Sequence, residues 1–245
     1  MAILVTRPHP DAETTAATLR ARGFEVLLAP MLRFEPAAFH DDTEARYGAV
    51  VVTSANALRA IETDLKASRL LRLPLFAVGE HTATVARDLG FEQVISGGGD
   101  AAALRDCVVG AVKSKAVKKA HPLLYLAGAD LARDLAGDFR QRGFTVVTQT
   151  TYRMVPVPSL RHEAREAFAA NQVEAVLHYS RRSAGAFLEA VRGAGMEISA
   201  LSVPQLCIST GVAAVLRDAG ATGVMAAASP DENALFVLLD RALRR

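Results

Sequence analysis

The chain has 245 residues, of which 51% are hydrophobic and 22% charged, and its formal net charge is +2 at pH 7. These proportions are ample for a packed core and exclude a disordered chain or a small disulfide-stabilised protein. The nearly balanced charge gives no sign of a nucleic-acid partner. The length fits one large α/β domain or two domains of about 120 residues each.

The first elements predict a β–α–β unit. Ile3 to Thr6 is a short apolar run, typical of a buried strand, that ends at Arg7-Pro8. A helix begins at Asp11 and is ended by Gly23, after which a second strand begins at Val26. Two strands joined in this way are expected to be parallel, with a right-handed crossover.

The same alternation continues along the chain, with helical stretches between short apolar runs. The further predicted strands are Ala49 to Val52, Leu75 to Val78, Gln93 to Ile95, Leu123 to Leu126, Val146 to Val147, Ala175 to His178, Gln205 to Ile208 and Gly223 to Met225. Roughly ten strands alternating with helices predict an α/β fold with two doubly wound parallel sheets of about five strands each.

An internal repeat supports the presence of two similar modules. Residues 19–26 (LRARGFEV) return as residues 139–146 (FRQRGFTV). Two further matches follow in the same order, namely 49–54 with 175–180 and 75–80 with 206–211. Two modules in one chain predict a cleft between them, since ligands are often enclosed at domain interfaces.

Two proline-containing segments interrupt the alternation, one near residues 31–39 and one near residues 150–158. Proline stiffens a segment and restricts its place in a sheet, so both are interpreted as extended linkers between domains. The residues alone leave open whether the two domains are contiguous or whether the chain leaves one domain and returns to it.

Several classes of site and location are not indicated. Cys107 and Cys207 have no CxxC or Cys/His clustering, and the histidines lack metal-ligand spacing. His178 lies in an apolar strand and is interpreted as a hydrogen-bonded core residue. The basic run Lys113 to Lys119 is interpreted as a solvated loop. No signal peptide or membrane span is evident, so the cytoplasm is the expected location.

The loops after the predicted strands are rich in hydroxyl groups and glycine. Because ligands bind beyond the carboxyl ends of parallel strands, these loops are the first candidates for a binding site. Helix N-termini that open there favour anions, although Ser, Thr, Asp and Asn also cap helices where no ligand binds. Ser229 and Glu232, with Pro230 between them, match a capping box.

Common catalytic signatures such as GxxxxGK[ST], GxGxxG, GxSxG and HExxH are absent from the sequence. Tyr152 is the exception among side chains, because an aromatic hydroxyl in a linker between two lobes would face the expected cleft. A phenol keeps its proton at neutral pH and can donate it to a departing oxygen, so Tyr152 suits a general acid. The alternative role is packing at the hinge.

Taken in order, these motifs resemble the uroporphyrinogen-III synthase family. The resemblance is carried by residues 4–8 (LVTRP), 52–57 (VTSANA), 77–83 (AVGEHTA), Tyr152 and Ser229-Pro230. It implies two flavodoxin-like domains joined by a two-stranded linker. The first domain would comprise residues 1–35 and 159–245, and the second residues 36–158.

The resemblance also implies an activity: a lyase that closes linear hydroxymethylbilane to uroporphyrinogen III, with loss of water and inversion of ring D through a spiro intermediate. This step serves the biosynthesis of haem, sirohaem, cobalamin and chlorophyll. Because the substrate closes spontaneously to the wrong isomer, catalysis is expected to depend on positioning. No cofactor or metal is expected, and hydroxymethylbilane synthase is a possible source of the substrate.

By the same resemblance, Tyr152 would assist departure of the hydroxyl group. The residues expected to hold the substrate's carboxylate arms are Arg7, Ser54, Ala55, Asn56, Gly79, Thr82, Gly128, Ser180, Ser183, Thr210, Gly211 and Ser229. The loop Ser209 to Val212 departs from the family, in which many members have glycine-proline followed by threonines. The resemblance is therefore a weaker basis for assigning substrate-binding residues at that loop.

Two other functional classes remain open at this point. A two-lobed small-molecule binding or sensor protein without catalysis would share the lobes and the hydroxyl-lined loops. A nucleotide-dependent transferase would need a glycine fingerprint that the sequence lacks. Because two lobes are enough to form a pocket, we expect a monomer.

Overall fold

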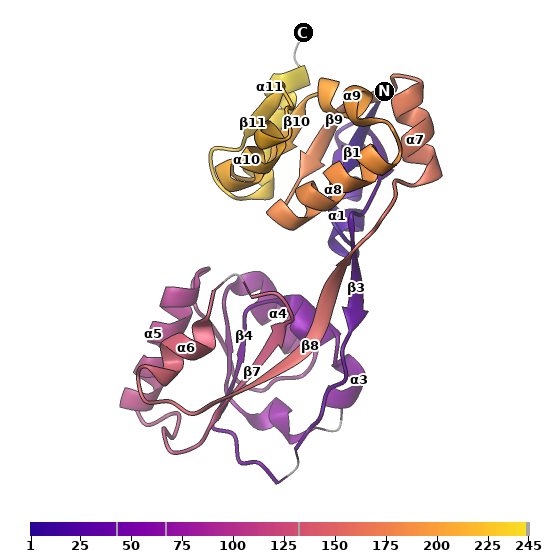
Figure 1. Cartoon of the computed structure of the whole chain (residues 1–245). Coiled ribbons are helices and arrows are strands. Elements are labelled where there is room, and N and C mark those ends of the chain that lie inside the picture. Colours follow the sequence, from indigo (N-terminus) through magenta and orange to yellow (C-terminus); the bar gives the residue numbers. More distant parts are fainter. Residues whose placement is uncertain (43, 67, 132, 244–245) are drawn as a thin grey trace. The chain divides into compact units, whose positions relative to one another are not determined.

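The computed structural model describes residues 1–42, 44–66, 68–131 and 133–243. The chain divides into two compact units (Figure 1). Unit 1 comprises Met1–Phe34 and Val155–Arg245, and unit 2 comprises Glu35–Met154. Each is an α/β unit built on a parallel sheet, as predicted.

Unit 1 contains a five-stranded sheet in the order β11-β10-β9-β1-β2. Its strands are β1 (Ala2–Val5), β2 (Glu25–Leu28), β9 (Val173–His178), β10 (Gln205–Cys207) and β11 (Val224–Ala226). Its helices are α1 (Asp11–Ala21), α7 (His162–Ala169), α8 (Arg181–Gly193), α9 (Glu197–Ser202), α10 (Thr210–Asp218) and α11 (Glu232–Leu243).

Helices cover both faces of the unit 1 sheet. Leu19 of α1 and Leu235 of α11 pack with Ile3 and other strand residues on one face. On the other face, Phe187 of α8 stacks edge-on against His178, with ring centroids 5.1 Å apart. His178 is fully buried and bonds Gln205 through Nε2 at 2.8 Å, which confirms its interpretation as a hydrogen-bonded core residue.

Unit 2 is arranged around the strand order β8-β7-β4-β5-β6, with β3 (Leu32–Pro36) beside β8. Its strands are β4 (Ala49–Val52), β5 (Leu75–Ala77), β6 (Val94–Ser96), β7 (Leu123–Gly128) and β8 (Val146–Pro156). Its helices are α2 (Ala55–Arg59), α3 (Glu62–Leu65), the 3₁₀ helix η1 (Arg69–Arg72), α4 (Glu80–Asp88), α5 (Ala101–Lys113) and α6 (Leu135–Arg140).

The unit 2 sheet also lies between two helical layers. On one face, Leu58 of α2 and Ala83 of α4 pack against Val50 and Leu124. On the other face, α5 and α6 pack against the sheet, and Phe139 of α6 is completely buried. Successive residues of β4 and β7 face one helical layer and then the other, and all of them are buried. This explains why both strands are continuous apolar runs.

The two sheets have the same strand order, but different segments of the chain supply the strands. Unit 1 follows the flavodoxin order 2-1-3-4-5, which results from β1 and β2 lying beside β9, β10 and β11. Unit 2 has the same arrangement if β7 and β8 are taken as its first two strands. The first strand pair of each sequence repeat therefore joins the last three strands of the other repeat.

Most of the sequence repeat matches the structure residue by residue. Phe24 and Phe144 donate their backbone N–H groups to Leu19 and Phe139, respectively, so the first match has an offset of 120 positions. The second match is also in register, because Val50 and Val176 donate to Pro74 and Pro204. These last bonds make Leu75 the counterpart of Gln205. The third match, which aligned Leu75 with Leu206, is therefore wrong by one residue.

The two segments predicted to be extended linkers are strands. β3 (Leu32–Pro36) lies within the first and hydrogen-bonds to β8, whose eleven residues run through most of the second (Figure 1). Unit 2 ends at Met154, although the expected second domain extended to residue 158. The N–H of Val157 donates to the carbonyl of Met31 at 2.9 Å, which ties this segment to unit 1.

Candidate functional site

A pocket of about 330 Å³ lies in unit 2, at the carboxyl ends of the neighbouring strands β7, β4 and β5. This is the edge at which parallel α/β sheets bind ligands. Tyr152 of β8 also lines the pocket. The pocket is lined by Thr53, Ser54, Val78, Ala101, Tyr125, Gly128, Asp130, Leu131, Arg133, Leu135 and Tyr152. It brings together three residues predicted from the sequence, namely Ser54, Gly128 and Tyr152.

Tyr152 lies against Gly128 in the pocket wall. The two residues are register partners in the β7–β8 pair, immediately after an irregularity at Ala127/Gly128. A Cβ atom at position 128 would come within 2.7 Å of the Tyr152 ring and 2.9 Å of its hydroxyl oxygen. Glycine is therefore required there for the ring to occupy its position.

A second tyrosine, Tyr125 of β7, also lines this pocket. It is only 2% exposed, and its hydroxyl oxygen lies 3.0 Å from the hydroxyl of Thr53. Burial raises the pKa of the Tyr125 phenol, and the hydrogen bond with Thr53 partly offsets this effect. Tyr125 therefore keeps its proton at neutral pH, and in its contact with Thr53 either hydroxyl group can donate.

Charged side chains line the same pocket from the loop before α6. Asp130 and Arg133 both come from this loop. The Arg133 guanidinium bonds the Asp138 carboxylate at 2.7 and 2.9 Å, and its side chain remains 51% exposed. Asp134 caps α6 by accepting the N–H of Gly137. The pocket thus combines an apolar wall with hydroxyl groups, a guanidinium and the Asp130 carboxylate. The hydroxyl groups and the guanidinium can donate to a ligand that bears carboxylates.

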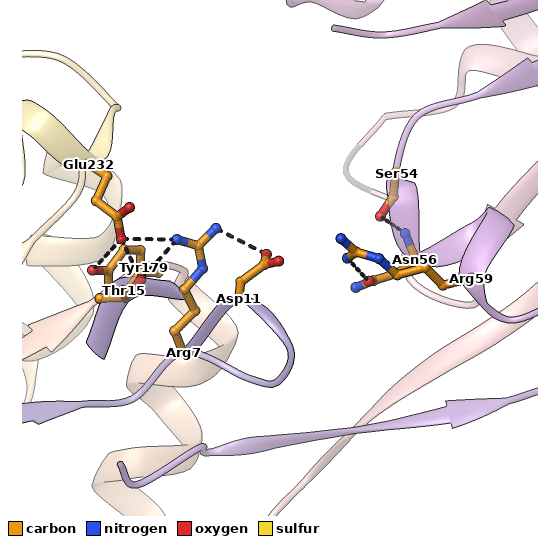
Figure 2. A network of polar contacts seen from close by, with 8 residues as sticks. All are labelled: Arg7, Asp11, Thr15, Ser54, Asn56, Arg59, Tyr179 and Glu232. Atoms are coloured by element: carbon orange, nitrogen blue, oxygen red, sulfur yellow. Dashed lines mark hydrogen bonds and ion pairs between the residues drawn. The ribbon is translucent and has the colours of Figure 1, made fainter. Parts of the chain in front are cut away.

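Ser54, Ala55 and Asn56 begin α2. The Ser54 side chain caps the helix by accepting the N–H of Asn56 at 3.2 Å, and Asn56 accepts a bond from Arg59 at 3.1 Å (Figure 2). Ala55 is 5% exposed and belongs to the core. Of these three, only Ser54 lines the pocket.

Gly79 and Thr82 lie at the start of α4 in the same unit. Gly79 is the N-cap residue, and a Cβ atom there would lie 3.5 Å from the Cα of Gly99. Thr82 is 5% exposed, so its side chain offers little surface to a ligand.

Arg7 lies in unit 1 and is engaged by acidic residues of that unit. Its guanidinium bonds Glu232 at 3.1 Å and Asp11 at 3.0 Å, and it lies over the Tyr179 ring (Figure 2). The same Glu232 oxygen accepts the hydroxyl protons of Thr15 and Tyr179. Burial and the adjacent Glu232 carboxylate raise the pKa of Tyr179, which keeps its proton in this bond.

The remaining predicted residues also belong to unit 1. Ser180 caps α8 through the N–H of Ser183, whose side chain is 1% exposed. Thr210 and Gly211 are exposed at the start of α10, and Ser209 caps this helix by accepting the N–H of Val212. The predicted capping box of Ser229 and Glu232 is wrong. Asp231 accepts the N–H of Ala234, while Glu232 bonds Arg7.

Thr53, Tyr125 and Arg133 line the pocket although the sequence did not single them out as site residues. Thr53 was visible as the residue following a strand. Tyr125 carried no such signal, because its position inside an apolar run predicts only core packing. Arg133 lies in a loop whose length the sequence pattern does not define.

Other kinds of site find no support in the part of the chain that the structure describes. It contains no group of three His, Cys, Asp or Glu side chains arranged to hold a metal ion. None of its helices has both the length and the apolar character needed to cross a membrane.

Comparisons with known proteins agree with this architecture. A family model described as "Uroporphyrinogen-III synthase HemD" matches residues 13–237. The uroporphyrinogen-III synthetase of Helicobacter pylori 26695 has a TM-score of 0.65 and 18% identity, with 99% of each chain covered.

A mutant uroporphyrinogen III synthase of the extremely thermophilic bacterium Thermus thermophilus has a TM-score of 0.57 and 17% identity, also with 99% of each chain covered. At these identities the solved structures establish the fold. No curated protein shows significant sequence similarity to the chain. The family model spans most of the sequence, and the chain therefore belongs to the uroporphyrinogen-III synthase family.

Proposed function

We propose that the chain, which has the synthase function of its family, binds part of hydroxymethylbilane in the unit 2 pocket and acts as a lyase. In this reaction the C–O bond of the hydroxymethyl group breaks and water leaves. The resulting cation is attacked by the substituted carbon of the terminal pyrrole ring, which gives the spiro intermediate. The protein's main task is to favour this carbon over the neighbouring one.

The observation that carries the proposal is the position of Tyr152. Its ring lies over Gly128, in a pocket that also contains Thr53, Ser54 and Tyr125. The Tyr152 hydroxyl is the proposed proton donor to the leaving oxygen, which departs as water. A positioned general acid contributes on the order of a hundredfold or more to a rate.

Other predicted contacts remain proposals of the same kind. Ser54 and the backbone around Gly79 and Gly128 would hold carboxylate arms in unit 2. Ser180, Ser183, Thr210, Gly211 and Ser229 would do so in unit 1, where Arg7 is already engaged by Glu232 and Asp11. We further infer that the protein works as a cytoplasmic monomer and receives its substrate from hydroxymethylbilane synthase.

The experiment that tests the function is product analysis with freshly generated hydroxymethylbilane. We expect the protein to form isomer III, whereas spontaneous closure gives isomer I. The Tyr152→Phe variant should lower kcat at least tenfold and leave the thermal unfolding midpoint unchanged. Exclusive formation of isomer I by the unsubstituted protein would exclude the synthase function. Undiminished kcat in Tyr152→Phe would exclude the acid role alone.

A further inference from the structure

The two units allow a residue-by-residue comparison of their ligand-binding edges. The N–H groups of Leu104 and Leu235 donate to the carbonyls of Asp100 and Asp231, respectively, so these aspartates are counterparts in the two units. Both aspartates also accept a backbone N–H three residues further on. The next residue along the chain is Ala101 in unit 2 and Glu232 in unit 1. Ala101 and Glu232 therefore occupy corresponding positions.

Two of the three partners of Glu232 have counterparts that line the unit 2 pocket, whereas Arg7 corresponds to the buried Ala127. Thr15 of α1 corresponds to Leu135 of α6, through the offset of 120 positions that aligns Leu19 with Phe139. Tyr179 corresponds to Thr53, through the match of residues 49–54 with residues 175–180. Ala101, Leu135 and Thr53 all line the pocket. Unit 1 thus holds its own carboxylate in the place that unit 2 leaves open.

The loop before the first helix adds to the difference. In unit 1 helix α1 begins at Asp11, whereas α6 of unit 2 begins at Leu135, the counterpart of Thr15. Asp130, Leu131 and Arg133 belong to the longer loop of unit 2 and line its pocket. A shorter helix and an alanine in place of a glutamate together account for the open space.

The geometry points to a carboxylate subsite in unit 2, with the internal Glu232 of unit 1 as its built-in model. We propose that one acetate or propionate arm of the substrate enters beside Ala101. Its methylene groups would pack on Ala101 and Leu135, and its carboxylate would accept bonds from the Tyr125 and Thr53 hydroxyls. This inference rests on the proposed function and specifies which part of the substrate the pocket holds.

The unit 1 cluster shows why such a subsite would work. There, a carboxylate accepts one phenol proton, one threonine proton and one arginine bond, all within a single unit. The unit 2 pocket offers the same three donor types in Tyr125, Thr53 and Arg133. Asp130 also lines this pocket, and its negative charge disfavours a second carboxylate close to it.

The main test introduces the missing carboxylate. Ala101→Glu should fill the subsite in the way that Glu232 fills unit 1, and should raise the KM for hydroxymethylbilane at least tenfold. Ala102→Glu is the matched control, because it adds the same charge to the same helix turn outside the pocket lining. It should change KM less than twofold. Equal effects of the two substitutions would overturn the proposal.

A second pair of variants keeps the proposal testable if Ala101→Glu does not fold. Tyr125→Phe and Thr53→Val each remove one hydroxyl group and should raise KM three- to tenfold. An unchanged KM in both would also overturn the proposal. Formation of isomer III by the unsubstituted protein separates failure of the subsite from failure of the proposed function.

Discussion

The carboxyl edges of the two sheets share one framework and differ in chemistry. In unit 1, Glu232 bonds Arg7, Thr15 and Tyr179, and these partners satisfy its charge within the unit. In unit 2, Ala101 occupies the position that corresponds to Glu232, and Leu135 the position that corresponds to Thr15. A pocket of about 330 Å³ remains there. Unit 1 thus satisfies these side chains internally, whereas unit 2 keeps an open pocket at the corresponding edge.

Glycines and apolar residues that set the framework occur in both units. Gly23 and Gly143 end corresponding helices with φ angles of +86° and +75°, and Gly90 and Gly220 have φ angles of +96° and +92°. Leu104 and Leu235 are both completely buried. The pairs Ala101/Glu232 and Leu135/Thr15 differ at the edge of the sheet, and the pair Val52/His178 differs inside the core. Substitutions that exchange features between the units test the effect of these differences.

The largest expected effect concerns His178, whose counterpart in unit 2 is Val52. Burial lowers the pKa of His178 to about 4, and Nδ1 has no hydrogen-bond partner. Above pH 6.5 the imidazole is neutral in both folded and unfolded chains, so it contributes no pH dependence. As the pH falls from 6.5 to 4, only the unfolded chain binds the proton, which lowers the free energy of unfolding by about 3 kcal/mol.

This loss is checked by urea unfolding between pH 4 and pH 8. His178→Val should be less stable at pH 8, because Gln205 loses its bond with Nε2. Its stability should then fall less steeply towards pH 4 than that of the unsubstituted protein. Parallel pH profiles for the two proteins would show that His178 does not cause the acid sensitivity.

The next effect concerns Gly97, whose counterpart is Ala227. Both donate their N–H groups to corresponding residues, Ala77 and Cys207. A Cβ atom at position 97 would lie 2.6 Å from the Cα of Leu104, so α5 would have to move. Gly97→Ala should lower the free energy of unfolding by about 2 kcal/mol. Ala227→Gly is the reciprocal control and should not raise the free energy of unfolding, because no strain is relieved. Unfolding measurements on both variants check these two expectations.

A smaller effect is expected from Glu232→Gln, which keeps the shape of the side chain and removes its charge. Arg7 then loses one ionic partner but keeps Asp11. Because hydrogen bonds to charged groups are worth more than neutral ones, we expect a loss of about 1.5 kcal/mol in unfolding free energy. The loss should shrink in high salt. A salt-independent loss would indicate packing rather than charge as its cause.

Much of the fold was predictable because it depends on local patterns. Apolar runs such as Ala49–Val52, and glycines such as Gly23 and Gly143 that follow helices, define the strands and their parallel connections. The pairing of β1 with β9 was not predictable from the residues alone, since tandem or exchanged repeats satisfy the same pattern. β8 also extended through its predicted linker, because pairing with β3 satisfies its backbone.

The site was less predictable than the fold. One pocket contains Ser54, Gly128 and Tyr152. In the sequence, Ser54 and Gly128 follow predicted strands, and Tyr152 lies in a predicted linker. Glu232 matched a capping motif, but its carboxylate bonds residues 217 and 225 positions away in the chain. Tyr125 resembles any core aromatic in the sequence. Such side-chain partners depend on tertiary distances that a local pattern does not contain.

The smallest expected effect concerns the two glycines that end α1 and α6. Gly23→Ala and Gly143→Ala each place a side chain at a positive φ, which costs about 1 kcal/mol. A Cβ atom at Gly23 would meet no atom within 4 Å, whereas one at Gly143 would approach Lys119 Nζ at 3.2 Å. Because a lysine end moves easily, the two losses should be nearly equal. Gly185→Ala, in the middle of α8 with no atom within 4 Å, should instead stabilise the protein, as unfolding midpoints would show. A much larger loss at Gly143 would mean that the two helix ends differ in more than their conformation.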